Sequence, residues 1–398
     1  MYKLDKDKLL FDLYIAYECA IKHKRNKPYI KEFEKKLSKN LIDLRDMLWN
    51  RTYIPQHSIC FIVSHPKKRE VFAANFRDRI IHHLYFNYTH KLYENTFIYD
   101  SYSCIKGKGT HFGIERFKKH ILQESNNYTE NCYVLKMDIS GYFMHIDREL
   151  LNNIALDSIK NMQEHLVVKK DDKKWKDIID IDFVNYLTTE ISTHDPSKNC
   201  IFRSNLIEWE DLPKSKSLFY SPKNCGLPIV NLTSQLFSNV YLNKLDQFVK
   251  RILGCKHYGR YVDDFYIVSK DKEFLHSIIP KIENFLKTEL RLNINKGKTK
   301  IINVKYGIEF LGAFIKPNRT YISNACLRRI KKRLNDYEYH PYNINIVNSI
   351  NSFLGIFSHY RSFNIRKNLF FNMKLTKDIG IFNELFTKFI PYNKLPIV

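Results

Sequence analysis

Apolar residues recur along this chain at the spacing of an α-helix in several segments. Leu9, Leu13, Ala16 and Ala20 lie three or four residues apart, which predicts an amphipathic helix near the N-terminus. Asn231 directly precedes a similar pattern and is a candidate N-cap residue. The same spacing predicts further helices over 32–49, 76–93, from 110 onward, through most of 150–193, over 274–290 and through most of 324–398.

Two pairs of short apolar runs predict β-hairpins. Residues 59–63 and 71–73 flank the basic turn Lys67-Lys68-Arg69, which is typical of a hairpin with a cationic tip. Residues 258–261 and 265–268 alternate in polarity and flank Asp263-Asp264. The second hairpin would therefore carry two adjacent acids at its turn.

Further strands are predicted at 133–135, which runs straight into Asp138, and at 308–315, which contains Gly312. The segment from 194 to 225 is polar and irregular. Because helices and strands interleave without a regular βαβ alternation, we expect an α+β fold.

Composition narrows the class of protein. Among the 398 residues 44% are apolar, which supplies a sizeable core and excludes wholesale disorder. Lys and Arg total 65 against 42 Asp and Glu, giving a net charge of +23. An excess this large favours a polyanionic partner, most often nucleic acid, although a basic soluble enzyme without such a partner is the alternative.

The cysteines and the apolar runs indicate the cellular compartment in which the protein acts. The eight cysteines lie far apart, without a C-x-x-C pair or a zinc-like spacing, so a disulfide framework and a zinc site are not expected. The N-terminus lacks the apolar stretch of a signal peptide, and no run approaches 18 apolar residues. We therefore expect a soluble, reduced, cytoplasmic protein without a membrane partner.

Asp263-Asp264 is the strongest local indication of chemistry. Two adjacent carboxylates between apolar strand residues are electrostatically costly unless a cation lies between them. A tight turn would be needed to direct both side chains to one point. Pairs of Asp are also common in ordinary turns, which is the alternative interpretation.

Asp138 ends a second apolar strand and could join this pair. Three carboxylates from two strand ends form a minimal ligand set for two divalent ions, which in such sites lie roughly 3.5–4 Å apart. Hard oxygen ligands without His or Cys favour Mg²⁺, with Mn²⁺ as a substitute. For Asp138 alone, a structural acid at the end of a strand is the alternative.

The order of these motifs resembles the reverse transcriptase family. A basic hairpin, the Asp138 strand, Gly226-Leu227-Pro228, Tyr261-Val262-Asp263-Asp264 and Phe310-Leu311-Gly312 follow one another from about Ile54 to Phe314. The sequence HYRSFN at 359–364 resembles the thumb of the family.

This resemblance implies a right-hand polymerase built from an α+β palm. The limits it implies are an N-terminal helical extension (1–29), fingers (30–129), a palm (130–316, with a helical insertion at about 150–220), and a helical thumb with a C-terminal extension (317–398).

The resemblance also implies roles for the acids and for one lysine. Asp138, Asp263 and Asp264 match the metal-binding aspartates, and the carbonyl of Ile139 matches a further ligand. Lys298 resembles the lysine that protonates the leaving pyrophosphate, although Lys296 could serve instead.

Residues implied to bind the nucleotide lie in three segments. Phe143 falls where the family places the aromatic ring that blocks a ribose 2′-OH, which favours deoxynucleotides. Lys67, Lys68 and Arg69 resemble the fingers residues that grip the triphosphate, Arg69 by a forked contact. The alternatives are an ordinary core Phe and a solvated hairpin tip.

The third nucleotide-binding segment departs from the common pattern. Pro228 is followed by Ile229 and Val230 where many relatives have Gln-Gly, and Gln235 ends the motif. A Ser-Gln ending resembles enzymes of diversity-generating retroelements, which usually have glycine at the position of Val230. A branched side chain there would narrow the pocket or change base selection.

Basic and aromatic residues near the C-terminus are the candidate nucleic-acid contacts. The thumb helix would track the phosphates of a template–primer duplex or of a noncoding RNA, and aromatic rings would add stacking. The alternative is a solvated basic helix. The residues concerned are Arg328, Arg329, Lys331, Lys332, Arg333, Tyr360, Arg361 and Phe363.

The resemblance leaves the biological role open. No endonuclease, maturase or RNase H motif is recognised, so we expect a stand-alone polymerase that uses dNTPs and RNA and makes DNA. One role is antiphage defence with a dedicated noncoding RNA, and another is a diversity-generating retroelement. A non-catalytic RNA-binding scaffold and untemplated nucleotide addition are the alternatives from other classes, and an accessory protein or a second copy of the chain is a further candidate partner.

Overall fold

The computed structural model describes residues 2–64, 67–167, 172–339, 346–371 and 373–392. The chain divides into two compact units. Unit 1 comprises 1–109, 136–267 and 273–300, and unit 2 comprises 110–135, 268–272 and 301–398. The predicted limits of fingers, palm and thumb are a different division of the chain and stay a prediction.

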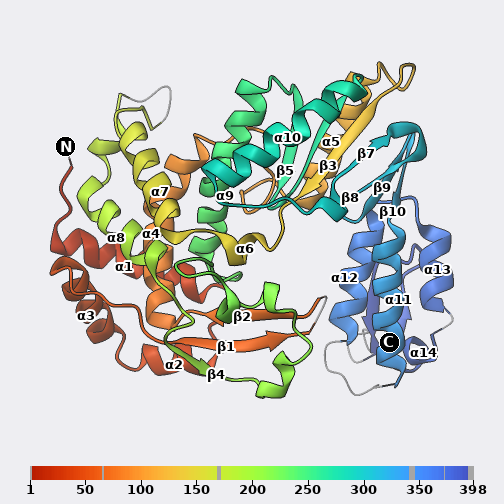
Figure 1. Ribbon diagram of the computed structural model, residues 1–398. Helices are drawn as coiled ribbons and strands as arrows, with labels where there is room; N and C mark the ends of the chain where they lie inside the picture. The colour runs from red at the N-terminus through yellow and green to blue at the C-terminus, as the bar shows by residue number, and fades with distance from the viewer. Residues whose placement is uncertain (1, 65–66, 168–171, 340–345, 372, 393–398) are drawn as a thin grey trace. The chain divides into compact units, whose positions relative to one another are not determined.

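Most of the predicted helices are present. In unit 1, α1 packs on α4, and α7 packs on α8 (Figure 1). The α-helices of the described residues are α1 (Lys6–Ile21), α2 (Pro28–Glu34), α3 (Leu37–Trp49), α4 (Phe76–Glu94), α5 (Thr110–Glu124), α6 (Tyr142–His145), α7 (Arg148–Met162), α8 (Ile181–Thr193), α9 (Leu232–Gln247), α10 (Lys272–Glu289), α11 (Asn324–Tyr339), α12 (Ile346–Ser358), α13 (Phe363–Phe371) and α14 (Lys374–Ile379).

Short helical turns connect several of these elements. Seven are assigned in the described residues, six as 3₁₀-helices and Phe248–Ile252, which continues α9, as a π-helix. The 3₁₀-helices are Trp175–Asp177, Leu206–Trp209, Lys214–Lys216, Leu218–Tyr220, Lys296–Lys298 and Val304–Tyr306.

Within the part of the chain that the structure describes, the strands form four small sheets, ordered β2-β1-β4, β5-β6-β3-β7, β10-β9-β8 and β11-β12. Both predicted hairpins are present, as β1–β2 (Figure 1) and as β5–β6. The strands are β1 (Ser58–Val63), β2 (Arg69–Ala73), β3 (Tyr133–Asp138), β4 (Cys200–Phe202), β5 (His257–Tyr261), β6 (Asp264–Ser269), β7 (Lys300–Asn303), β8 (Ile308–Phe310), β9 (Ala313–Lys316), β10 (Arg319–Ile322), β11 (Gly380–Phe382) and β12 (Phe389–Pro391).

The first sheet has two faces with different environments. Cys60 and Phe72 are register partners and lie on one face, in a buried cluster with Met144 and Leu218. Ile59 and its partner Ala73 lie on the other face and are only half-buried. Alternation along the strands therefore gives this sheet a packed face and an open face.

A buried carboxylate joins the packed face to the segment that precedes the Gly-Leu-Pro motif. Glu70 is 2% exposed and accepts hydrogen bonds from Trp209 Nε1 (2.7 Å), Ser217 Oγ (2.8 Å) and the Leu218 amide (2.6 Å). Three donors compensate for the burial of this charge, because an unpartnered carboxylate here would be strongly destabilising. Glu70 thus fixes the 209–218 segment to β2.

A buried ion pair organises the β5–β6 hairpin. Arg260 Nε and Nη2 donate to the two carboxylate oxygens of Asp246 at 2.8 and 2.7 Å, and both side chains are fully buried. Tyr258 donates to the same carboxylate at 2.6 Å. Arg260 Nη1 donates to the Val262 carbonyl (3.0 Å) and to Asn239 Oδ1 (3.2 Å), so α9 is connected directly to the turn of the hairpin.

The structure corrects two predicted helical features. The helix expected over 32–49 is divided, since α2 ends at Glu34 and α3 begins at Leu37. Asn231 does precede α9, but its side chain makes no capping hydrogen bond. Instead Asn231 Oδ1 accepts from the Ala74 amide at 3.4 Å.

Two predicted non-helical features are also corrected. The strand expected over 308–315 is a hairpin of β8 and β9, because Leu311 and Gly312 have positive φ values of 48° and 85° and form the turn. The segment from 194 to 225 is not wholly irregular, since β4 pairs in parallel with β1.

Arg260→Met should lower the free energy of unfolding by about 3–5 kcal/mol, because it leaves the buried Asp246 carboxylate without its cation. Chemical denaturation followed by circular dichroism measures this change. Arg251→Met is the matched control, since Arg251 is exposed and hydrogen-bonds only within its own helical segment. A loss for Arg260→Met no larger than that of the control would contradict the structural role of the pair.

Candidate active site

The end of β3 and the turn of the β5–β6 hairpin lie together in unit 1. The Ile139 amide donates to the Asp263 carbonyl at 3.3 Å, which ties the residue after Asp138 to the turn. On the other side, the Asn295 amide donates to the Asp138 carbonyl at 2.7 Å. Backbone hydrogen bonds thus bring the predicted acids into one region from two distant segments.

The turn that carries the acid pair has an unusual backbone. Val262 adopts φ +56°, in the left-handed region that β-branched residues rarely occupy. Its carbonyl accepts from Arg260, and its amide donates to Ser103 Oγ at 3.3 Å. Because the surrounding contacts hold both the amide and the carbonyl of Val262, the strained conformation is stabilised.

Electrostatic interactions connect the three carboxylates. Burial and the like charges of Asp138 and Asp264 together raise the pKa of Asp263 to about 6, against the opposing effect of Lys298. Burial also raises the pKa of Asp264, although nearby Lys136 lowers it. At neutral pH the site therefore concentrates negative charge at a cost to stability.

Two lysines partly neutralise this charge. Lys298 Nζ lies 2.9 Å from Asp138 Oδ2, and Lys136 Nζ lies 3.7 Å from Asp264 Oδ1. The hydrogen bond with Asp138 raises the pKa of Lys298, so its ammonium form is favoured. Of the two lysine candidates, Lys298 is thus placed at the acids, whereas Lys296 lies 3.8 Å from Glu283.

Asp138, Asp263 and Asp264 are the candidate ligands of a divalent ion. Within the described ranges, no group of three or more His, Cys, Asp or Glu side chains is arranged as a metal-ligand cluster, so metal binding by the three acids stays a prediction. Their chemistry nevertheless fits a hard cation, because carboxylate oxygens are its preferred ligands, and burial together with repulsion among the acids raises the pKa of Asp263. A metal ion would replace the lysines as the neutralising charge.

Phe143 lies on α6, shortly after β3. Its ring is half-buried and packs against the cluster on the packed face of the first sheet, together with Ile229. Gly141 precedes α6 with φ +54°, where an added Cβ would lie 2.8 Å from His145 Nδ1. Glycine at this position permits the sharp turn that directs α6 back from β3.

The Gly-Leu-Pro segment is anchored to α6 and α7. The Gly226 amide donates to the Ile146 carbonyl (2.8 Å) and the Leu227 amide to the Phe143 carbonyl (2.9 Å). Arg148, 4% exposed, donates through Nη1 to the Gly226 carbonyl at 3.2 Å. These contacts place the segment next to Phe143, the predicted gate residue whose ring would block a ribose 2′-OH.

The four predicted residues of this motif have different environments. Pro228 is buried, and Ile229 packs on the side of Phe143. Val230 is 53% exposed, and with Gln235 it lines a pocket on the open face of the first sheet. The motif therefore contacts the buried cluster near Phe143 through Ile229 and lines the pocket on the open face through Val230 and Gln235.

The cationic hairpin tip is open to solvent. Lys67 and Arg69 are exposed, while Lys68 lies 3.7 Å from the exposed Asp211. The 209–218 segment that Glu70 anchors therefore also approaches the tip.

The predicted nucleic-acid contacts lie in unit 2. Along α11, Cys326, Ile330, Leu334 and Tyr337 are buried in a cluster with α12 and α13. Four of the basic residues are exposed, namely Arg328, Arg329, Lys331 and Lys332. This helix therefore has an apolar inner side and a cationic outer side.

Two of the predicted contacts in unit 2 are less accessible. Arg333 lies over the Tyr337 ring and donates to its hydroxyl at 3.1 Å. Tyr360 packs against the buried cluster, and burial raises its pKa to about 12. Arg361 and Phe363 remain exposed.

Several residues that shape the site were not predicted from sequence. Arg260, Asp246 and Ser103 hold the acid-bearing turn, and Lys136 accompanies Asp264. Two sequence features could have indicated these partners, because Arg260 lies within a predicted strand and Asp246 lies among apolar residues of a predicted helix. A charged residue in such a position is rarely buried without a partner of opposite charge.

Asp263→Asn should stabilise the protein at neutral pH by about 1–2 kcal/mol, because it removes a carboxylate charge that burial and the neighbouring acids disfavour. The folded state binds this proton more tightly than the unfolded state, so the wild type gains stability as pH falls through about 6. The advantage of the variant should therefore disappear near pH 4. Thermal unfolding at several pH values measures it, and a pH-independent difference would be inconsistent with this electrostatic account.

A family model described as "Reverse transcriptase (RNA-dependent DNA polymerase)" matches residues 64–315. No curated protein matches the chain.

Solved telomerase structures from two Candida species are similar at low identity. Apo telomerase from Candida tropicalis is 13% identical, with a TM-score of 0.46, and the match covers 79% of this chain and 56% of that chain. Telomerase from Candida albicans with a fragment of telomeric RNA is 12% identical, with a TM-score of 0.45, and the match covers 82% and 59%. The chain thus spans less than two thirds of these telomerase chains.

Proposed function

The chain belongs to the reverse transcriptase (RNA-dependent DNA polymerase) family, and we propose that it is an RNA-directed DNA polymerase that adds dNTPs to a primer. Members of this family have the right-hand polymerase fold, in agreement with the α+β prediction. The observation that carries the proposal is the convergence of Asp138 with the Asp263-Asp264 turn, held by backbone hydrogen bonds. We further propose the fingers, palm and thumb limits given by the resemblance.

Asp138, Asp263 and Asp264, with the Ile139 carbonyl, would hold the divalent ions that reverse transcriptases generally use. We propose Mg²⁺, because all these donors are hard oxygens. Two such ions supply activation of the 3′-oxygen and stabilisation of the leaving pyrophosphate. Lys298 keeps its proton at neutral pH and would donate it to the pyrophosphate after releasing Asp138.

Phe143 would select the sugar. Its ring is supported from behind by the buried cluster of Cys60, Phe72 and Leu218, so it cannot move aside easily for a 2′-hydroxyl. Lys67 and Arg69 are exposed and available to a triphosphate. Arg69 would make a forked contact with the phosphates.

We propose RNA as the template, in a cytoplasmic antiphage defence role with a dedicated noncoding RNA. The net charge of +23 and the cationic outer side of α11 support RNA binding, while Val230 in place of glycine supports a specialised template. The described helices include none that is long and apolar enough to cross a membrane. Sequencing of RNA that co-purifies with the protein tests this role, and a heterogeneous RNA population would contradict it.

Asp263→Ala combined with Asp264→Ala should reduce dNTP incorporation by at least ~10³-fold, because the divalent ions would lose two of their proposed ligands and bind weakly. Primer extension with and without Mg²⁺ measures the activity, and circular dichroism confirms the fold. Asp271→Ala with Glu273→Ala is the control, since these exposed acids lie just beyond β6. Undiminished synthesis by the first variant would place the chemistry elsewhere.

Phe143→Ala should relax sugar selection by roughly 10–100-fold, because it removes the ring proposed to exclude the 2′-hydroxyl. The ratio of kcat/KM for dNTP and rNTP measures this change. Phe219→Ala removes a ring that packs on Phe72 instead and serves as the control. If both variants keep the wild-type ratio, Phe143 is not the gate.

A further inference from the structure

Helix α1 carries large apolar side chains on the side that faces away from the protein core. Its inner side is buried through residues that include Leu9 and Leu13. On its outer side Phe11 is 58% exposed, and Tyr14 and Ile15 are 44% and 40% exposed. Apolar residues on both sides are typical of a helix that is covered on both sides, because a surface helix usually turns charged residues to the solvent.

The neighbouring helix α3 extends this apolar surface. Ile42 and Trp49 are 38% and 41% exposed and lie seven residues apart, so they share one side of α3. Lys6 of α1 connects the two helices, because its Nζ lies 3.7 Å from Asp46 Oδ1 and 5.8 Å from the centre of the Trp49 ring. A patch of large exposed apolar side chains commonly marks an interaction site. We call this patch the α1–α3 face, and it consists of Phe11, Tyr14, Ile15, Ile42 and Trp49.

The local charge at the α1–α3 face disfavours a polyanionic ligand. Helix α1 and its N-cap residue Asp5 contain four acids and two lysines, giving a local charge of −2 in a chain of net charge +23. Nucleic acid and anionic membrane surfaces bind where Lys and Arg gather, so neither suits this helix. Both helices also precede residue 64, where the family match begins. The face therefore suits a protein partner and lies outside the matched part of the chain.

The two ends of α1 carry charges of opposite sign. Asp7 lies in the first turn, and Lys22 is the C-cap residue. Both side chains are exposed, and neither forms an ion pair with another residue that the structure describes. Asp7 precedes Tyr14 by seven residues, and Lys22 follows Ile15 by seven residues. The two charges are therefore equally distant from the middle of the helix.

This spacing makes the outer side of α1 complementary to itself. One stripe on this side has intervals of four, four and seven residues, the spacing of a single helix face, and consists of Asp7, Phe11, Ile15 and Lys22. A twofold axis between Tyr14 and Ile15 would pair two such helices antiparallel and place Asp7 of each copy opposite Lys22 of the other. A twofold contact requires this property, because the same surface serves on both sides of it.

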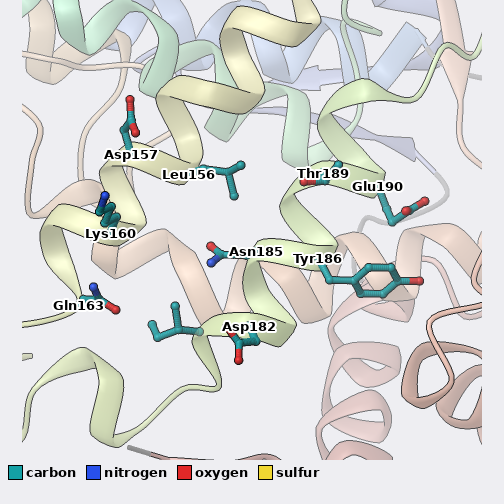
Figure 2. A pocket seen from close by; sticks show the side chains of 10 residues that line it. Leu156, Asp157, Lys160, Gln163, Asp182, Asn185, Tyr186, Thr189 and Glu190 are labelled. Carbon is teal, nitrogen blue, oxygen red and sulfur yellow. The ribbon is translucent and has the colours of Figure 1, made fainter.

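A head-to-tail contact would instead need a different acceptor surface on the second copy. The groove between α7 and α8, with a volume of about 620 Å³, is a concave candidate in the same unit. Figure 2 shows Asn185 of α8 pointing toward α7, with Asp157 and Asp182 at the periphery. Asp157, Asp182 and Glu190 line the groove, against the single cation Lys160. An apolar stripe on a helix of negative local charge does not complement this acidic lining.

We propose that the α1–α3 face is the interface of a homodimer, in which the two α1 helices pack antiparallel about a twofold axis between Tyr14 and Ile15. Burial of the aromatic and aliphatic side chains drives the association. The two symmetry-related pairs of Asp7 with Lys22 set the orientation and the register of the helices. The proposal is independent of the proposed function, because the candidate active site contains no residue of this face.

Sedimentation velocity of the nuclease-treated protein over a range of concentrations measures the association. Wild-type protein should reversibly reach twice the mass of one chain. Phe11→Ser combined with Ile15→Ser should stay monomeric over the same range, because it removes apolar area that the dimer buries. Circular dichroism confirms that the variant folds.

The control variant combines Leu206→Ser with Ile207→Ser. These apolar side chains are 65% and 62% exposed but lie outside the α1–α3 face. The control should dimerise as the wild type does. A monomeric control, together with a Phe11→Ser, Ile15→Ser variant that still dimerises, would overturn the proposal by assigning the interface to the surface of the control.

Two charge reversals test the antiparallel arrangement itself. Asp7→Lys alone brings two lysines together at each end of the helix pair, and Lys22→Asp alone brings two aspartates together. Each variant should therefore dimerise at least ~tenfold more weakly than the wild type. An equimolar mixture of the two variants should recover the association, because every end of the mixed dimer again pairs a lysine with an aspartate. Recovery on mixing cannot come from a change in folding, since neither chain is altered.

Three results would contradict the homodimer. Wild-type protein that stays monomeric up to its solubility limit would overturn the proposal as a whole. Charge-reversal variants that dimerise as tightly as the wild type would overturn the antiparallel arrangement, and so would a mixture that associates no better than its components. All of these measurements are made without substrate, so they leave the proposed polymerase activity untouched.

Discussion

The fully buried guanidinium of Arg260 is the contact on which the arrangement of the site depends. Asp246 of α9 compensates for its charge, and the same guanidinium donates to the Val262 carbonyl in the acid-bearing turn. Because Val262 has φ +56°, the turn is strained and would relax if this hydrogen bond were lost. The acids are therefore positioned by a buried ion pair that never contacts substrate in our account, and the repulsion among them is tolerated since the turn cannot open.

A second buried charge performs a similar task in the first sheet. Glu70 holds the 209–218 segment, and this segment covers the face against which Phe143 packs. The sheet thereby acquires one closed face toward Phe143 and one open face with the pocket that Val230 and Gln235 line. The two faces are separated by the alternation of side chains along β1, in which Cys60 lies on the closed face and Phe61 on the open face.

Local patterns predicted much of the fold. Both hairpins and the strand ending at Asp138 were predictable, because their alternation and turn residues lie within a few positions of each other. The three-residue strand β4 was not, since it exists through pairing with β1, about 140 residues earlier in the chain. Asn231 shows the same limit, because its side chain bonds the Ala74 amide in place of its own helix. The three acids could be predicted from the sequence as catalytic residues. Their partners Arg260, Asp246 and Lys136 could not, because these residues are brought to the acids by tertiary contacts that the spacing of residues does not reveal.

Extension of a primer annealed to a defined RNA template, with one dNTP supplied at a time, tests directly whether the protein is an RNA-directed DNA polymerase. RNA-directed synthesis at the Asp138, Asp263 and Asp264 site predicts that only the dNTP complementary to the next RNA base is added, and only when a divalent ion is present. Addition that ignores the template base, or addition that persists with a chelator, would contradict the account.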